Sequence, residues 1–347
     1  MDIDDLKGQI KLNCNISDSK YWGHFSICGL LMRLRELYRN EHALYPWQEL
    51  PQKDITEWIA EREELWKTLE DRDIQLLEID GEVYMPFEAD AVNKVLNPLG
   101  FLYGSGYAMF GKPAFFLARL EGRREIYDYQ VYYTDRELCR DLSVSVAMLQ
   151  GRCVFVRLEN LKSLLWEKFQ ELKGRRFGGT LEEAFSFYGI GKNDIPSKEL
   201  YKKIEDISTD ISELFVLHET GEAFEDRRSD EWLGILAADK DRKAEFYIRG
   251  IKDLLADASD MGPLSFITRE KDRALLYFYI VFLDGIRREI FPEMMDFFQK
   301  FAENGDWSLM KKATAAAYMK AQRLQGLVLD QWNGKNMEGI LEALGRR

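Results

Sequence analysis

A histidine and a glutamate interrupt the apolar face of a predicted helix, and no other pair in the sequence is better placed for chemistry. The predicted helix includes residues 204–226, and its apolar stripe continues at helical spacing to His218 and Glu222. Buried polar side chains are costly unless they find partners, so neighbouring groups must satisfy both residues. The simplest interpretation is a hydrogen bond between His218 and Glu222 in the core, completed by Arg249 or Arg287.

The same pair also supports a metal-binding hypothesis, because an imidazole and a carboxylate at positions i and i+4 lie on one helix face. The segment HETGE at 218–222 matches the beginning of the zincin motif H-E-x-x-H, but glutamate stands where the second histidine ligand is required. Any other ligands would have to come from neighbouring predicted helices. The candidate metal ligands are His218, Glu222, Glu245, Asp253 and Asp284.

A charged stripe follows on the next predicted helix, where Glu245, Arg249, Asp253 and Asp257 are spaced four residues apart. Such a stripe is usually an exposed ladder of ion pairs, each worth a few tenths of a kcal/mol. If it lines a cleft against His218, it forms a polar site instead. The sequence leaves both alternatives open.

A glycine-rich stretch, GYAMFGKP at 106–113, differs from a phosphate-binding loop by one decisive residue. Pro113 stands where the Ser or Thr that holds magnesium should be, and a predicted strand follows in place of a helix. A nucleotide site is therefore not predicted, although Lys112 remains a candidate contact for an anion. We expect the glycines of this region to form a turned or flexible loop. They are Gly100, Gly104, Gly106 and Gly111.

The composition excludes several classes of protein. The chain has 347 residues and a net charge of -12, which argues against a nucleic-acid partner because phosphate binding needs a basic face. The longest apolar run, 274–283, is half the length that a bilayer requires, and the acidic first ten residues show no signal-peptide pattern. Four scattered cysteines without Cys-x-x-Cys spacing favour reduced thiols. We expect a cytoplasmic protein that does not enter a membrane.

The N-terminal half combines predicted helices with a small antiparallel sheet. Ser17 is the expected N-cap of a helix at 20–40, and Asp54 begins a capping box for a helix that ends near residue 71. Short strands around the turn Asp80-Gly81 predict a tight hairpin, and a second hairpin is expected around the sequence EGRRE. The predicted strands are 76–79, 82–85, 114–120, 126–133 and 153–157.

The C-terminal half is predicted to be helical throughout. The expected helices cover 161–172, a segment beginning at Thr180, and then 197–226, 242–258, 269–289, 292–303, 308–329 and 331–344. The run 274–283 is apolar on every side, which indicates a helix surrounded by other helices. The glycine-rich segment 174–179 is the expected boundary between an N-terminal domain, 1–175, and a C-terminal domain, 176–347.

With these stretches in view, the chain resembles a family of uncharacterised bacterial proteins, a domain-of-unknown-function group. The resemblance rests on SICGLLMRLRELYRNEH, GKPAFFLARL, CRDLSVSVAML, HETGEAFED and RGIKDLLADAS. It covers most of the chain and implies a cytoplasmic protein of two parts. The family carries no assigned activity, so no functional residue is transferred from it.

The sequence thus predicts an α+β fold, mostly helical, with a small antiparallel sheet in the N-terminal half and an all-α C-terminal domain. Two hypotheses of function remain. The first-ranked is a non-enzymatic interaction or structural protein whose polar core residues fix the packing of its helices. The alternative is a small-molecule- or metal-binding helical protein, with or without enzymatic activity, whose site surrounds His218 and Glu222. No cofactor and no partner, whether a protein or a small molecule, can be identified from the residues.

Overall fold

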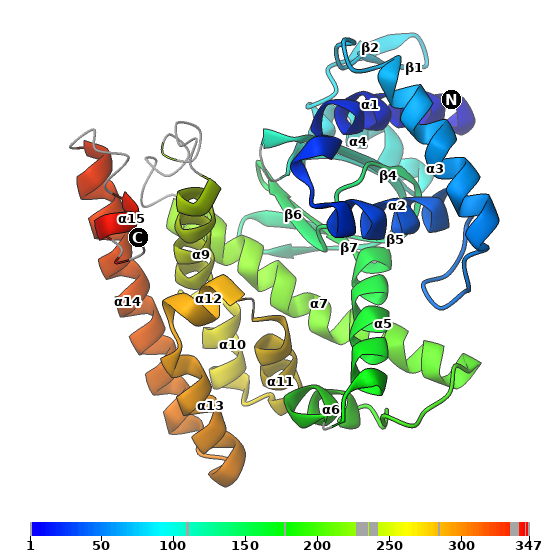
Figure 1. Cartoon of the computed structure of the whole chain (residues 1–347). Coiled ribbons are helices and arrows are strands. Elements are labelled where there is room, and N and C mark those ends of the chain that lie inside the picture. Colours follow the sequence, from blue (N-terminus) through cyan, green and yellow to red (C-terminus); the bar gives the residue numbers. More distant parts are fainter. Residues whose placement is uncertain are drawn as a thin grey trace. The chain divides into compact units, whose positions relative to one another are not determined.

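The computed structural model describes residues 2–108, 111–176, 178–226, 235, 242–283, 285–333, 340–343 and 345. The fold is α+β and mostly helical, as predicted, with its strands in the N-terminal half and helices in the C-terminal half (Figure 1). Two compact units can be distinguished. Unit 1 comprises 1–171 and 195–208, and unit 2 comprises 172–194 and 209–347.

The N-terminal helices of unit 1 differ from the prediction of one helix at 20–40. Helix α1 runs Ile3–Tyr21 and α2 runs Ile27–Glu41, with a short 3-10 turn, η1 Trp22–His24, between them. Ser17 was wrongly expected to be a cap: it lies buried inside α1, and Ser26 caps α2 by accepting from the backbone of Gly29. Helix α1 escaped prediction because much of its buried face is polar and therefore lacks an apolar stripe.

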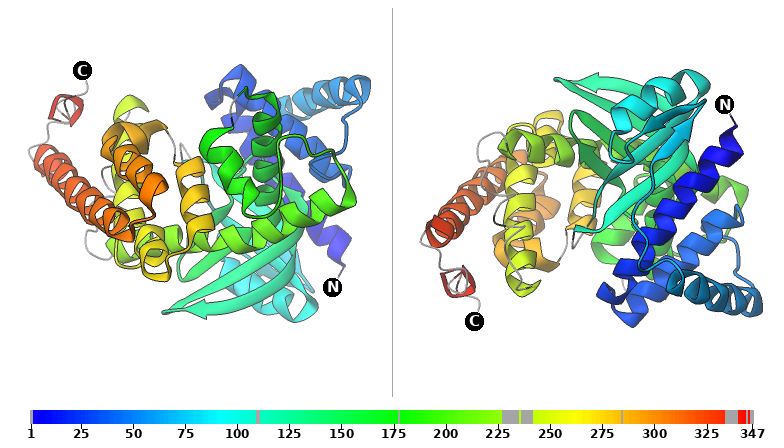
Figure 2. Two further views of the ribbon diagram at one scale, coloured as in Figure 1. Left: turned by 90° about the horizontal axis from the view of Figure 1, so that it is seen from below. Right: turned by 90° about the horizontal axis from the view of Figure 1, so that it is seen from above.

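The main sheet has the strand order β3-β4-β5-β7-β6. All neighbouring pairs are antiparallel except β5 and β7, which are parallel. Helices α1 and α2 pack on the sheet, and the views of Figure 2 show α1 crossing it. The strands are β3 Phe101–Tyr107, β4 Pro113–Ile126, β5 Tyr129–Arg140, β6 Ala147–Gln150 and β7 Cys153–Arg157.

The glycine-rich region is in part a strand where a loop was expected: Gly104 and Gly106 lie in β3, whereas Gly100 and Gly111 lie outside it at positive φ. The residues of β3 pair with β4, and Gly104 lies opposite Phe116. A Cβ atom at Gly104 would stand 2.0 Å from the Phe116 ring, so close packing of that ring explains this glycine. Sequence reasoning took the glycines as signs of a turn because a strand glycine and a loop glycine have the same local signature.

The two predicted hairpins have different outcomes. Strands β1 Leu77–Ile79 and β2 Glu82–Tyr84 form the first one as predicted, with Asp80 and Gly81 at positive φ in the turn. In the second, the sequence EGRRE lies within β4, and the chain turns later, where Tyr127 adopts φ 54°. Tyr127 is 56% exposed in this turn, so the strand predicted at 126–133 begins later, at Tyr129.

The first part of α7 Lys198–Asp226 also belongs to unit 1, and four further elements complete it. They are α3 Gln52–Lys67, α4 Ala89–Leu96, η2 Asn97–Leu99 and α5 Leu158–Gly174, whose last three residues belong to unit 2. The capping box expected at Asp54 does not form, because α3 begins after Pro51 without a side-chain cap.

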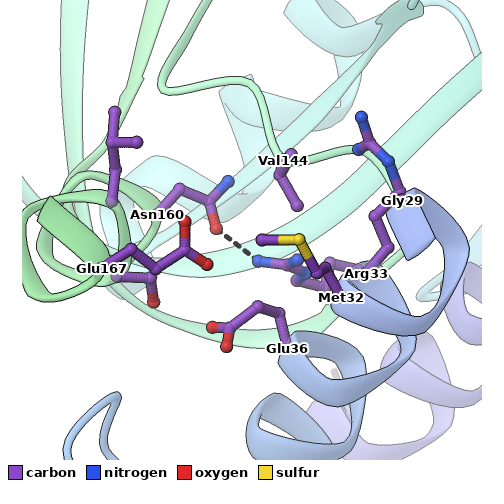
Figure 3. Close-up of a pocket in the computed structure, with 10 residues that line it drawn as sticks. Gly29, Met32, Arg33, Glu36, Val144, Asn160 and Glu167 are labelled. Carbon is purple, nitrogen blue, oxygen red and sulfur yellow. Dashed lines mark hydrogen bonds between the residues drawn. The ribbon is translucent and has the colours of Figure 1, made fainter. Parts of the chain in front are cut away.

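A surface cavity of about 200 Å³ in unit 1 is lined by residues of α2, α5 and the segment around Arg140 and Val144 (Figure 3).

Unit 2 is helical. Its helices are α6 Gly179–Ser186, the second part of α7 Lys198–Asp226, α9 Arg242–Ala258, α10 Pro263–Glu270, α11 Arg273–Phe282, α12 Gly285–Ile290, α13 Glu293–Asn304, α14 Trp307–Asn333 and α15 Ile340–Ala343. Helix α9 packs against α10, α12 and α14, and α11 packs against α6. The apolar run is buried in α11 as predicted, from Leu275 to Ile280.

Two features of the helical prediction for unit 2 need correction. The helix expected at 269–289 is two helices, α11 and α12, and α10 was not predicted. The helix expected from Thr180 is α6, which begins one residue earlier, after Gly178, without a side-chain cap. The α7 start was predicted correctly: the Ser197 hydroxyl accepts a hydrogen bond from the backbone of Leu200 at 3.2 Å.

Candidate functional site

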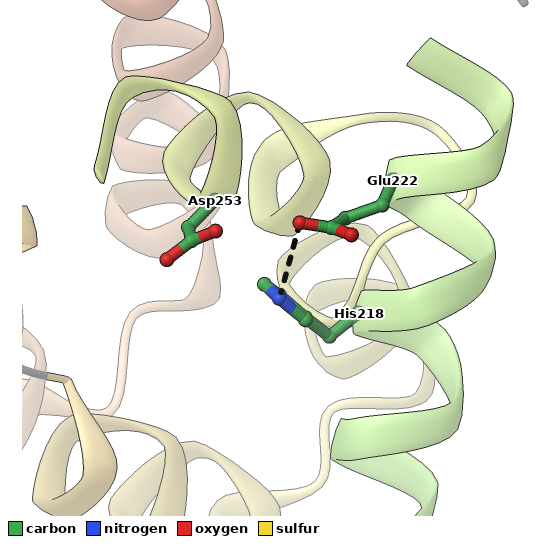
Figure 4. A group of neighbouring side chains, drawn as sticks. All are labelled: His218, Glu222 and Asp253. Atoms are coloured by element: carbon green, nitrogen blue, oxygen red, sulfur yellow. Dashed lines mark ion pairs between the residues drawn. The ribbon is translucent and has the colours of Figure 1, made fainter. Parts of the chain in front are cut away.

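Two helices of unit 2 bring one imidazole and two carboxylates together. His218 and Glu222 lie one turn apart on α7, and Asp253 faces them from α9 (Figure 4). Each of the three offers one ligand atom, and these atoms all lie within 4.8 Å of one another. The distance from His218 Nε2 to Glu222 Oε1 is 3.9 Å, which is too long for a hydrogen bond. The predicted hydrogen bond between the two residues is therefore not formed.

The direct partner of the imidazole is a carboxylate one turn further along α9. His218 Nδ1 donates to Asp257 Oδ1 at 2.7 Å, and Asp257 is 1% exposed. This bond fixes the plane of the ring and directs Nε2 towards Glu222 and Asp253. A carboxylate that holds one ring nitrogen while the other faces a site is the arrangement that orients metal-binding and catalytic histidines.

Asp257 is itself held by two donors from the segment 279–287. The Tyr279 hydroxyl donates to Oδ2 at 2.9 Å, and Arg287 Nη1 donates to the same oxygen at 2.6 Å. Arg287 also donates through Nη2 to the carbonyl oxygen of Phe282 at 3.2 Å. Tyr279 and Arg287 thus fix the position of the Asp257 carboxylate. Of the two arginines named from the sequence, Arg287 is the one that joins the hydrogen-bond network of His218.

His218 and Asp257 each stabilise the charged form of the other. Burial alone would lower the pKa of His218, but the Asp257 carboxylate and its hydrogen bond, followed by Glu222 and Asp253, raise it to about 10. Burial opposes ionisation of Asp257, but Arg287 and His218 lower its pKa to about 2. At neutral pH the pair is therefore an imidazolium bound to a carboxylate.

Other carboxylates around the imidazole ionise with difficulty. Burial raises the pKa of Asp253. The charge of His218 opposes this shift, the nearby Glu222 carboxylate adds to it, and the resulting pKa is about 7. Burial and Glu222 likewise raise the pKa of Glu219 to about 7. Lys252 partly neutralises the group, with Nζ at 3.6 Å from Glu222 Oε2 and 3.2 Å from Asp226 Oδ2. The cluster accordingly holds more carboxylates than nearby cations can neutralise.

A cavity of about 160 Å³ opens beside the imidazole. It has polar walls formed by side chains of the site and apolar walls formed by neighbouring helices. Its lining residues are Leu214, Phe215, His218, Asp253, Asp257, Pro263, Tyr279, Phe282 and Arg287. A molecule in this cavity would contact the imidazole and the Asp253 carboxylate from an apolar enclosure, which strengthens electrostatic interactions.

The candidate metal ligands chosen from the sequence fall into three groups. His218, Glu222 and Asp253 come together, whereas Glu245 pairs with Arg249 on its own helix at 2.9 Å and is not in the cluster. Asp284 lies outside the described residues. The charged stripe on α9 therefore divides, because its first two residues form an ion pair and its last two face His218.

Lys112, the candidate anion contact, lies in unit 1 and is 1% exposed. Its Nζ is 2.9 Å from Asp18 Oδ1 and 3.1 Å from Asp141 Oδ1. Two carboxylates thus already surround the ammonium group. This position favours a structural role for Lys112 over contact with an anionic ligand.

Sequence reasoning missed three residues that shape the site. Asp257 was recognised only as part of the α9 stripe, although its spacing of four from Asp253 placed it on the same face. Tyr279 lies in the most apolar helix, where a hydroxyl group signals a need for a buried partner. No feature of the sequence distinguished Lys252 as a site residue, because an isolated lysine is most often exposed.

The fold and this cluster define an α+β protein whose helical unit contains a histidine–carboxylate site. The chain belongs to the DUF6866 family of unknown function: the model of the family's N-terminal domain matches residues 5–157, and the model of its C-terminal domain matches 162–344. Comparison with curated proteins and with solved structures gives no match. Among the described helices, none combines the length and apolar character that crossing a membrane requires.

Proposed function

We propose that the protein binds a divalent metal ion through His218 Nε2, Glu222 and Asp253. The observation that carries this proposal is the convergence of the three ligand atoms within 4.8 Å, beside a ring that Asp257 holds in place. Imidazole combined with carboxylates suits Zn²⁺, Mn²⁺ or Fe²⁺. Two ligands of one such ion stand at most roughly 4.2 Å apart, twice a bond of about 2.1 Å, so any separation close to the 4.8 Å limit must shorten slightly on binding.

The electrostatics of the cluster favour a cation. Asp253 and Glu219 have pKa values of about 7 because burial and nearby carboxylates oppose their ionisation. A divalent ion would replace the protons that now relieve this repulsion. It would also displace the proton on His218 Nε2, while Nδ1 keeps its hydrogen bond to Asp257. Metal affinity should consequently rise with pH.

The adjoining cavity supports a role beyond structural metal binding. His218 and Asp253 both line it, so an ion between them would face the cavity. Three protein ligands leave coordination positions for water or a small molecule, as at catalytic zinc sites. The protein would then be a metal-binding helical protein that accepts a small molecule at the ion.

Elemental analysis tests the proposal directly. The purified, untagged protein should contain one equivalent of metal, or take up one equivalent of Zn²⁺ or Mn²⁺ at pH 8 after treatment with a chelator. His218→Ala and Asp253→Asn should each lose the metal. Glu245→Gln is the matched control, because it removes a carboxylate from the same helix without touching the cluster. This variant should retain the metal.

The opposite result would overturn the proposal. If the wild type contains no metal and takes up none after treatment with a chelator, the cluster has a structural role only. Equal metal content in all three variants would place the ion elsewhere. Either result would favour the alternative of a non-enzymatic interaction protein.

One observation favours that alternative as a second candidate. Helix α2 and the turn before it expose several large apolar side chains, a feature typical of interaction surfaces. They are Trp22 at 47%, Ile27 at 81%, Leu31 at 46% and Met32 at 53% exposure. A protein partner could cover this face.

Three broader expectations also stand as proposals. The protein consists of two domains, 1–175 and 176–347, and the two family models support a division of this kind. The protein is cytoplasmic, in line with four free cysteines. It does not bind nucleic acid, in line with a net charge of -12.

A further inference from the structure

A buried arginine in unit 1 lacks hydrogen-bond partners for two of its nitrogens. Arg140 ends β5, is 5% exposed and lines the cavity shown in Figure 3. Its Nη1 donates to Asn160 Oδ1, but within the described residues Nε and Nη2 have no partner. Unsatisfied buried donors are rare in folded proteins because each one costs free energy. Arg140 is thus equipped to receive an anionic group.

The carboxylate that pairs with Arg140 is shared with a second arginine. Glu137 Oε2 lies 3.6 Å from Arg140 Nη1, but both Glu137 oxygens accept from Arg157, at 2.5 and 2.8 Å. Arg33 also lines the cavity, and burial followed by the charge of Arg140 lowers the pKa of its guanidinium. Two guanidinium groups therefore line the cavity, and Arg140 shares the Glu137 carboxylate with Arg157.

Two carboxylates also line the cavity. Glu36 on α2 and Glu167 on α5 extend towards the middle of the cavity in Figure 3. Glu36 is 3.2 Å from Arg39 Nε, whereas Glu167 has no hydrogen bond or ion pair within the described part of the chain. Burial and then the charge of Glu36 raise the pKa of Glu167. A cationic group between the two would relieve their repulsion.

The remaining walls are apolar. Met32, Val144 and Leu164 line the cavity, and Met32 and Val144 are 53% and 37% exposed. Covering such side chains is favourable by roughly 25 cal/mol for each Å² of apolar surface. The cavity therefore combines guanidinium groups, carboxylates and apolar side chains in its lining.

We propose that this cavity binds a small zwitterion of the α-amino-acid class. The carboxylate contacts Arg140, the ammonium lies between Glu36 and Glu167, and an apolar side chain packs against Met32 and Val144. Nε and Nη2 of Arg140 are not exposed to solvent, so the side chain must rotate for them to reach the ligand carboxylate. The site lies entirely in unit 1 and is independent of the metal cluster in unit 2.

Calorimetric titration of the full chain tests this proposal with L-leucine, L-methionine and L-phenylalanine. At least one should bind with a stoichiometry of one. The N-acetyl derivative of that amino acid lacks the ammonium charge, and the amide derivative lacks the carboxylate. Each derivative should bind at least about tenfold more weakly, because a hydrogen-bonded charge is lost.

The variant Glu167→Gln identifies the ammonium end without endangering the fold, because Glu167 makes no ion pair among the described residues. It should weaken amino-acid binding at least about tenfold and leave binding of the N-acetyl derivative unchanged. Glu171→Gln, one turn further along α5, removes a carboxylate that pairs with Lys168 and should have no effect. Arg140→Lys should weaken binding of the amino acid by losing the planar donor pair.

Several outcomes would overturn the proposal. If none of the three amino acids binds at millimolar concentration, the cavity is not an amino-acid site. If the N-acetyl derivative binds as tightly as the free amino acid, the site recognises only an anion. If the amide derivative binds equally well, it recognises only a cation. Unchanged binding in Glu167→Gln would place the ligand elsewhere.

Discussion

The imidazole of His218 and the carboxylate of Asp257 form a buried ion pair between α7 and α9, with Nδ1 and Oδ1 at 2.7 Å. Tyr279 and Arg287 hold the other oxygen of Asp257, so the carboxylate cannot turn away from the ring. The pair thus sets both the charge of His218 and the direction of its free nitrogen. Its effects on pKa and stability can be measured without knowing any ligand.

Replacing Asp257 by asparagine should lower both the pKa of His218 and the stability of unit 2. The variant leaves Arg287 buried without its carboxylate, a change that typically costs about 3–5 kcal/mol. The pKa of His218 should fall well below about 10 because the nearest negative charge is lost. NMR titration of the histidine ring protons measures the pKa, and urea unfolding measures the stability.

The pH dependence of this stability difference follows from the directions of the pKa shifts. The raised pKa of His218 contributes stability that is complete below about pH 6.5 and is lost as the pH rises through about 10. The lowered pKa of Asp257 contributes stability above about pH 3.8 that is lost as the pH falls through about 2. The difference should therefore be largest between about pH 4 and 6.5. Asp260→Asn, at an exposed position just after α9, is the control; an equal loss in that variant would contradict the prediction.

Replacing Asp253 by asparagine should stabilise the protein in the absence of metal. Its pKa is raised from 3.8 to about 7, so the cost of this carboxylate to folding grows from about pH 4 upwards and is complete above about pH 7. We expect a gain of roughly 1–2 kcal/mol at pH 8, which declines as the pH falls and disappears below about pH 4. Thermal unfolding in a chelator measures it. A loss of stability at pH 8 would show that the carboxylate holds the helices together.

Replacing Lys112 by methionine should destabilise unit 1 strongly. The substitution leaves Asp18 and Asp141 buried without their shared cation, at a cost of about 3–5 kcal/mol. Adding Asp18→Asn should restore part of the loss, because one of the two unpaired carboxylates is then removed. Urea unfolding of the single and double variants measures both effects. A single variant as stable as the exposed control Lys53→Met would argue that Lys112 serves a ligand and not the fold.

The measurement of metal content and the amino-acid titration are independent, because the proposed metal ligands lie in unit 2 and the proposed amino-acid site lies in unit 1. His218→Ala should leave amino-acid binding unchanged, and Glu167→Gln should leave the metal content unchanged. Carrying out both measurements on both variants separates a specific loss of ligand from general unfolding.

Local patterns in the sequence were sufficient to predict much of the secondary structure. The hairpin at Asp80-Gly81, the start of α7 at Ser197 and the bounds of α9 follow from turn chemistry, capping and periodicity, which act over a few residues. The prediction failed where a distant contact overrides local preference. Gly104 extends in β3 because the Phe116 ring occupies its side-chain space, and α1 is helical although its buried face is polar.

For the candidate site as well, local patterns predicted some features and tertiary contacts decided the others. The sequence by itself determined that His218 and Glu222 share one helix face and that Asp253 and Asp257 share another, because helical spacing fixes both. Only the tertiary structure decided that these faces meet, that Asp257 and not Glu222 binds the imidazole, and that Glu245 stays apart. The packing of α7 on α9 selects which turns face each other, and that selection depends on contacts across the whole helical unit, which no local pattern encodes.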